Sequence, residues 1–187
     1  MDILFLGPAD SPVAHHLRRI GETVSVTADL IDPRVVTAQR PDFLVSHGYR
    51  HIIRHDVLAA AHDRTINLHI SYLPWNRGAD PNLWSWIEDT PKGVTIHFVD
   101  EHLDTGDIIA QRQVAFGSDE TLGSSYARLQ HEMLTLFTEQ WPLIRAGRCE
   151  RRPQRGTGSA HRVADRAAVE HLLVDGWDTP VAALARR

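Results

Sequence analysis

Three polar side chains in the middle of the chain have the chemistry needed for acyl transfer. Asn67 and His69 lie two positions apart in a short apolar run, so on a β-strand their side chains would share one face. The amide can donate to a developing oxyanion, and the imidazole adds a donor or a base that titrates near neutral pH. Asp104 follows in a glycine-bearing turn, where a carboxylate could keep the imidazole protonated and oriented.

Each of these residues also has an ordinary structural interpretation. Asn67 could tie down a loop, His69 could be a hydrogen-bonded core histidine, and Asp104 or Asp107 could close a turn. A metal-dependent hydrolase that uses His69, His97 and Asp104 is a second functional reading. A catalytically silent binding module, with the C-terminal tail or the long helix at 121–144 as its surface, is a third.

The elements around these residues predict an α/β fold. Alternating strands and helices over the first 70 residues favour a largely parallel sheet between helical layers. Strands are expected at 3–6, 23–28, 42–46, 65–70, 93–100 and 108–114, with helices at 12–20, 52–61, 82–88 and 121–144. Residues 145–161 read as an extended or mobile tail, and 167–174 as a short final helix. Both breaker-rich loops, 71–81 and 102–107, are expected to leave the carboxyl ends of strands, where ligands bind in such sheets.

Length and composition limit the functional classes. The chain has 187 residues, a formal net charge of -4 and one cysteine, so packing must stabilise it and nucleic acid is an unexpected partner. We expect a catalytic domain at 1–150 and a short C-terminal extension at 151–187. No signal peptide or membrane-spanning run is evident, which favours a cytoplasmic protein without a membrane partner.

The combined motifs resemble the formyltransferases that use 10-formyltetrahydrofolate. The resemblance is carried by Asn67–Pro74, which contains the Asn-x-His pair and a Leu-Pro loop, by Gly93–Phe98, and by Leu103–Ile109. It covers about residues 42–114 most clearly and is closest to the sugar N-formyltransferases. It implies a Rossmann-like formyltransferase fold with a mostly parallel central sheet flanked by helices.

The resemblance also implies roles for individual residues. Asn67 and His69 would stabilise the oxyanion, and Asp104 would hold His69 protonated and help move the proton of the attacking amine. Backbone groups would line the folate pocket, and no metal would be required. The residues implied in folate binding are His51, Ile52, Ile53, Asp100, Glu101, Leu103 and Asp104.

Within the family, the loop after the Asn-x-His pair implies a nucleotide-activated amino-deoxy sugar as the acceptor. Aromatic rings could stack on a sugar or base, while polar side chains bond hydroxyls or phosphates. The residues expected to bind it are Tyr72, Trp75, Asn76, Arg77 and Asn82. The chain is short for such an enzyme, so another small amine of secondary metabolism stays an alternative, whereas length and charge disfavour tRNA. Similarity also suggests a possible homodimer.

Overall fold

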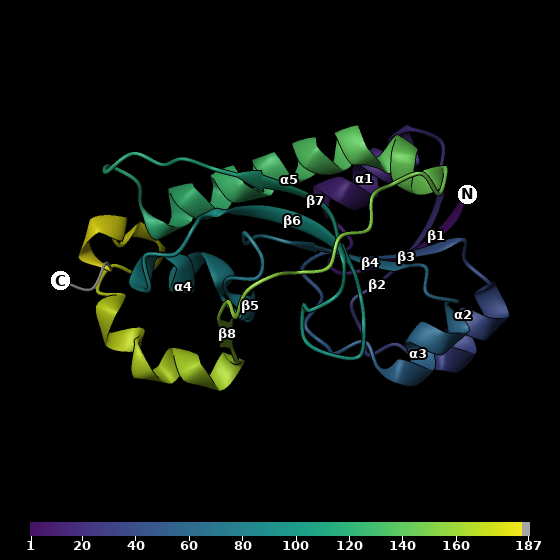
Figure 1. The fold of residues 1–187 in the computed structure, drawn as a ribbon, viewed down its shortest axis with the longest axis horizontal. Helices are drawn as coiled ribbons and strands as arrows, with labels where there is room; N and C mark the ends of the chain where they lie inside the picture. Colours follow the sequence, from purple (N-terminus) through teal and green to yellow (C-terminus); the bar gives the residue numbers. More distant parts are fainter. Residues whose placement is uncertain (185–187) are drawn as a thin grey trace.

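A six-stranded sheet forms the centre of the protein in the computed structural model, which describes residues 1–184 (Figure 1). Its strand order is β2-β1-β3-β4-β6-β7. The first four strands are parallel, whereas β6 and β7 run antiparallel to their neighbours. The strands are β1 (Asp2–Leu6), β2 (Thr23–Thr27), β3 (Phe43–Ser46), β4 (Thr65–His69), β6 (Gly93–Phe98) and β7 (Ile108–Gln113). The predicted mostly parallel α/β fold is confirmed.

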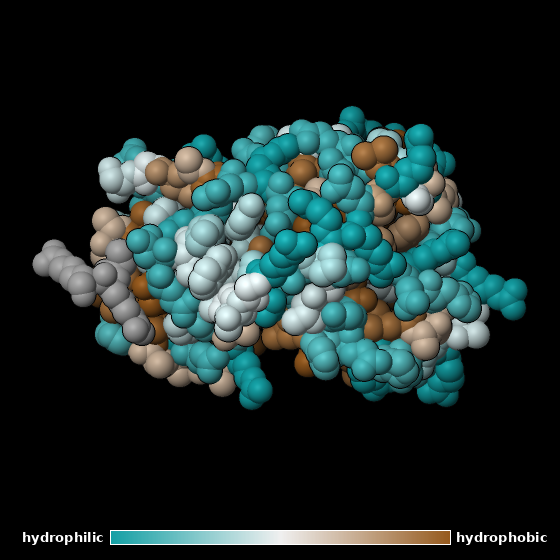
Figure 2. Space-filling view, viewed as in Figure 1, coloured by the Kyte–Doolittle hydropathy of each residue, from teal (hydrophilic) through white to brown (hydrophobic). Residues whose placement is uncertain are grey.

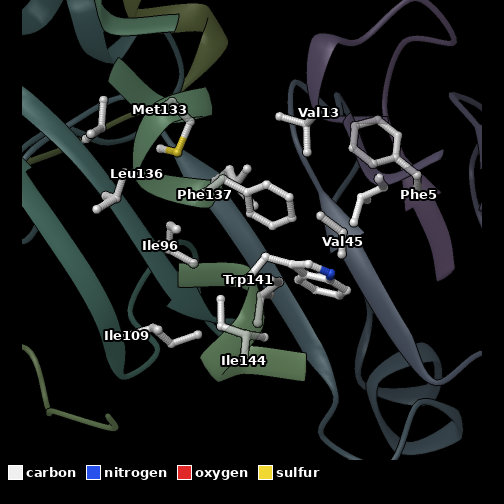
Figure 3. Packing of buried hydrophobic residues seen from close by; sticks show 14 of the residues in the cluster. Phe5, Val13, Val45, Ile96, Ile109, Met133, Leu136, Phe137, Trp141 and Ile144 are labelled. Carbon is white, nitrogen blue, oxygen red and sulfur yellow. The ribbon is translucent and has the colours of Figure 1, made fainter. Parts of the chain in front are cut away.

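One face of the sheet is covered by α1 (Pro12–Arg19) and α5 (Leu122–Arg145), which lie together above it in Figure 1. The largest apolar cluster fills this interface. Phe137 and Trp141 from α5 pack with Phe5 and Val45 from the strands (Figure 3). Of the two caps that the sequence allowed, Ser118 and Thr121, Thr121 is the N-cap of the long helix. Its hydroxyl accepts from the amide of Ser124, and the Ser124 hydroxyl accepts from the amide of Thr121.

The opposite face is covered in two parts. A second apolar cluster packs α2 (Pro33–Gln39) and α3 (His55–Ala60) against β1 and β3. The sequence reading missed α2, although Asp32 caps it by accepting from the amide of Arg34 and Pro33 occupies its first turn. Under β4 and β6, loops and the C-terminal part of the chain replace these helices.

The C-terminal part returns to this region and packs against α4 (Pro81–Ile87). Residues 160–161 form β8, which pairs in parallel with β5 at Arg77–Gly78. The predicted helix at 167–174 is wrong: 3₁₀ turns occupy Val163–Ala168 and Glu170–Leu172, between which Val169 inserts into a third apolar cluster beside Leu83 and Trp84. None of the helices within residues 1–184 is long and apolar enough to cross a membrane.

Candidate active site

The polar residues of β4 and β6 share the sheet face that α1 and α5 do not cover. Along β4, Ile66 and Leu68 point into the main core, so Asn67 and His69 point the other way. The antiparallel register pairs Asn67 with His97 and His69 with Thr95. Four polar side chains therefore lie together where two neighbouring strands meet.

Asp104 reaches these strands from a different direction than the sequence predicted. Because β6 is antiparallel to β4, the carboxyl ends of these two strands lie at opposite edges of the sheet. The loop after β4 and the loop after β6 therefore leave opposite edges. Residues 99–107 fold back instead, and Asp104 adopts a left-handed backbone conformation with φ of 52°. A Cβ on Gly106 would overlap the carbonyl oxygen of Phe98, so this close return requires glycine.

The Asp104 carboxylate joins the site through both oxygens. Oδ1 accepts from Asn67 Nδ2 at 3.0 Å and lies 3.4 Å from His97 Nε2. Oδ2 accepts from the Gly78 amide at 2.8 Å and lies 3.6 Å from His69 Nδ1. Its side chain is only 11% exposed. Asn67, His69 and Asp104, which the sequence singled out, are thus brought into one constellation.

Electrostatics keeps this carboxylate ionised. Burial raises the pKa of Asp104, but the positive charge of protonated His69, hydrogen bonding and charge from His97, and the Gly78 amide outweigh burial and hold its pKa well below the usual range. The site therefore contains a buried anion that faces His69 and His97.

His69 is held at both ring nitrogens. Nε2 lies 2.9 Å from the main-chain carbonyl oxygen of Asn76, and Nδ1 faces Asp104. Because a carbonyl oxygen can only accept, Nε2 donates to Asn76, while Nδ1 lies 3.6 Å from the Asp104 carboxylate. Asn76, whose carbonyl oxygen makes this contact, has a left-handed backbone conformation with φ of 56°.

His97 is a site residue that the sequence reading considered only as a metal ligand. Its Nδ1 donates to the carbonyl oxygen of Phe98 at 2.7 Å, which places Nε2 beside both Asn67 and Asp104. A neutral ring accepts from the Asn67 amide, and a protonated ring donates to Asp104. The alternation of β6 was the available signal, since His97 follows buried Ile96 on the polar face. In the described part of the chain, no three His, Cys, Asp or Glu side chains form a group that could hold a metal ion.

The residues predicted to line a folate pocket lie on two adjacent segments. An ion pair of 2.8 Å between His55 and Glu101 links the start of α3 to the loop after β6. Ile52 and Leu103 are 72% and 45% exposed, whereas Ile53 is buried. His51, Asp100 and Glu101 are exposed. Figure 2 shows the molecule hollowed at its lower edge, with apolar surface inside the hollow.

The residues predicted to bind the acceptor divide into two groups. Trp75 is 37% exposed, and Tyr72 and Arg77 are partly exposed. Asn76 and Asn82 are buried and bond within the protein: the Asn76 amide donates to Thr90 Oγ1 at 2.7 Å, and the Asn82 amide donates to the Leu122 carbonyl oxygen at 3.0 Å. The Asn76 and Asn82 side chains therefore support the protein interior and are not exposed to an acceptor.

Both a family model and solved structures match this chain. The formyl transferase family model matches residues 25–140. A structure of the formyltransferase PseJ from Anoxybacillus kamchatkensis, in complex with UDP-4,6-dideoxy-4-formamido-L-AltNAc and tetrahydrofolate, is 48% identical with a TM-score of 0.92; the match covers 97% of this chain and 96% of that one.

Two curated relatives are longer than this chain. Methionyl-tRNA formyltransferase of Ralstonia pickettii is 34% identical over 174 residues, which are 91% of this chain and 51% of that protein. The dTDP-4-amino-4,6-dideoxyglucose formyltransferase of Mycobacterium bovis is 44% identical over 84 residues, covering 45% of this chain and 36% of that protein. The chain therefore spans about half or less of these curated relatives. The chain belongs to the formyl transferase family.

Proposed function

We propose that this protein is an N-formyltransferase that moves a formyl group from 10-formyltetrahydrofolate to the amine of a nucleotide-activated amino-deoxy sugar. The observation that carries the proposal is the 48% identity to PseJ over 96% of that chain, whose complex holds a formamido sugar nucleotide and tetrahydrofolate. On the sequence alone, the shortness of this chain left other small amines open as acceptors. A formyltransferase of nearly the same extent supports the sugar nucleotide instead.

The proposed chemistry uses the constellation around Asp104. The donor supplies a formyl carbon whose oxygen becomes negatively charged when the acceptor amine attacks. Asn67 and His69 would donate to that oxygen when the bound formyl group replaces one of their present partners, which are His97 and Asp104 for Asn67 and the Asn76 carbonyl for His69. Each such donor contributes roughly 10²-fold to 10³-fold in rate. Asp104 would hold His69 protonated and help carry the proton that the amine loses toward the departing nitrogen of the folate. Carbon–nitrogen bond formation to the amine is thereby matched by cleavage of the bond to the folate.

The segments at 51–53 and 100–103 fit a folate donor. Exposed Ile52 and Leu103 offer apolar contact to a flat ring system, and the exposed backbone beside them offers donors and acceptors. Leu103 directly precedes Asp104, so a ring bound there would bring its formyl group to the catalytic residues.

The exposed and partly exposed side chains of the loop after β4 are the ones that we propose to bind the acceptor. Trp75 and Tyr72 would stack on the sugar or base, and Arg77 would meet the diphosphate or a hydroxyl. For Asn76 and Asn82 we propose a different role from the one expected: Asn76 orients the carbonyl that meets His69, and Asn82 anchors α4 to α5.

A tRNA acceptor is the second candidate because the methionyl-tRNA formyltransferase matches most of this chain. The net charge of -4 disfavours it, since binding to a phosphate backbone depends on clustered cations. It is therefore included as an arm of the experiment.

The experiment incubates the purified protein with 10-formyltetrahydrofolate and three acceptors: UDP- or dTDP-linked 4-amino sugars, the same amino sugars without the nucleotide, and methionyl-tRNA. Mass spectrometry reads each product for one added formyl group. We expect formylation of a sugar nucleotide, and little of the unlinked sugar or the tRNA. Preferential formylation of methionyl-tRNA would reassign the acceptor, and absence of formyl transfer to any amine would overturn the proposed function.

A further inference from the structure

The segment that follows α5 returns to the catalytic turn, a contact that the sequence did not indicate. It runs across the lower side of the sheet toward β8 (Figure 1). Arg152 and Ile108 exchange two main-chain hydrogen bonds of 2.7 and 3.0 Å, which fix the segment beside the start of β7. Two residues later, the side chain of Gln154 lies against the turn that carries Asp104.

Both hydrogens of the Gln154 amide are directed to that turn. Nε2 donates to the main-chain carbonyl oxygen of Asp104 at 2.8 Å and to that of Gly106 at 2.9 Å. These two carbonyl groups lie on either side of Thr105, so the Gln154 side chain bonds to the turn both before and after this residue. The left-handed conformation of Asp104 is uncommon for a residue with a Cβ. The two hydrogen bonds from Gln154 hold the turn that contains it.

The other end of the same amide is bonded to the strand that contacts the carboxylate. Gln154 Oε1 accepts from Arg77 Nε at 3.1 Å and Nη2 at 2.8 Å. The next residue, Gly78, donates its amide to Asp104 Oδ2. The contacts therefore close a ring that runs from the Asp104 turn through Gln154, Arg77 and Gly78 back to the Asp104 carboxylate.

From this ring we infer that Gln154 is a positioning residue for Asp104, which it holds in contact with Asn67 and His69. The inference rests on the proposed function, because it assigns Gln154 to formyl transfer. Gln154 acts on the backbone of Asp104 and not on the reacting atoms. A displacement of the carboxylate by about 1 Å would suffice to reduce turnover by roughly 10²-fold.

The kinetic test compares Gln154→Ala and Gln154→Glu in the wild-type and the Asp104→Asn backgrounds. In the wild-type background we expect kcat to fall about 10-fold to 100-fold while KM for the folate donor changes less than about threefold. Gln154→Glu keeps an acceptor for Arg77 but removes the two donors to the turn, so it should be as impaired as the alanine variant. In the Asp104→Asn background, Gln154→Ala should change kcat less than about twofold, because its effect is exerted through Asp104.

Gln113→Ala is the matched control, since Gln113 is an exposed glutamine on β7 and is expected to keep wild-type kinetics. Equal losses in both backgrounds, retained activity in Gln154→Glu, or a kcat for Gln154→Ala within twofold of wild type would overturn the inference.

A second measurement does not depend on activity. Hydrogen exchange of peptides that cover residues 103–108 should be about tenfold faster in Gln154→Ala, with exchange in β1 unchanged. Unchanged exchange at 103–108 would overturn the inference even if no acceptor is formylated. Absence of formyl transfer by the wild-type protein, by contrast, counts against the proposed function.

Discussion

Asn67 connects two titratable side chains through a single amide nitrogen. Nδ2 donates to Asp104 and lies 3.3 Å from His97, so the amide is oriented by the protein before a substrate arrives. His69 is likewise held between Asp104 and the Asn76 carbonyl. Contacts within the protein therefore fix the orientation of both side chains before a substrate binds.

The first prediction concerns these two donors. Asn67→Ala and His69→Ala should each lower kcat for formyl transfer at least about 10²-fold and leave the protein folded, because each removes a donor to the formyl oxygen. Steady-state kinetics and circular dichroism measure both quantities. Thr65→Val is the matched control on β4, since its buried hydroxyl has no partner among the described residues and its loss should leave kcat unchanged. Wild-type turnover in either alanine variant would contradict the assigned roles.

A second prediction concerns His47, which follows β3 in the interior. Burial lowers the pKa of His47 to about 4. The folded-state pKa lies below the unfolded value of about 6.5, so the unfolded chain binds a proton at this position that the folded protein does not. The free energy of unfolding should therefore fall as pH drops from about 6.5 to 4, by on the order of 3 kcal/mol from this group alone.

Urea unfolding of wild type and His47→Gln at pH 7 and pH 4.5 measures this contribution. The variant should lose clearly less stability between the two pH values, whatever its stability at pH 7. An equal loss in both proteins would show that His47 is not the residue responsible.

At the scale of elements, the return of the loop between β6 and β7 decides where Asp104 lies. The loop must pass within contact of its own strand, and Gly106 permits this because it has no Cβ. On the other side, β5 presents the Gly78 amide to the carboxylate. Two short, irregular segments thus complete a site that the regular strands begin.

The third prediction tests this close return. Gly106→Ala should destabilise the protein by about 1–3 kcal/mol and lower kcat, because a methyl group forces the turn away from the backbone of Phe98. Thermal unfolding and kinetics measure the two effects. Gly117→Ala is the control, since its new methyl group would meet only the movable side chain of Asp119. Similar behaviour of the two variants would contradict the importance of the close contact.

At the scale of the whole molecule, the C-terminal extension is joined to the catalytic core at several places. The amide of Leu122 donates to the carbonyl of Thr179, and the amide of Val181 donates to that of Glu120, so residues 179–181 bracket the start of α5. Leu184 and Val169 contribute to the apolar cluster around α4.

The fourth prediction follows from this packing. Calorimetric unfolding should give one transition with equal calorimetric and van't Hoff enthalpies, because residues 151–184 share buried surface with the core. Val169→Asp should lower the midpoint of that transition without splitting it, whereas Val163→Asp, at a 78% exposed position, should change it little. A separate low-temperature transition of the C-terminal part would contradict the prediction.

The sequence by itself determined the α/β class, most of the elements and the catalytic candidates. Ile66 and Leu68 alternate with Asn67 and His69, and this period-two pattern assigns the polar pair to one face of a strand without knowledge of its neighbours. The glycine-bearing turn around Asp104 was equally visible. These features are local, since they depend on residue types a few positions apart.

Only the tertiary structure decided how these parts meet. The antiparallel direction of β6, the burial of Asn76 and Asn82, and the contact of Gln154 with Asp104 all depend on the path of the chain between distant residues. An asparagine in a polar loop has the same sequence signature whether its amide faces a ligand or a buried threonine. The physical reason is that hydrogen-bond partners are set by distance in space, and 50 residues separate Gln154 from the carbonyl that it holds.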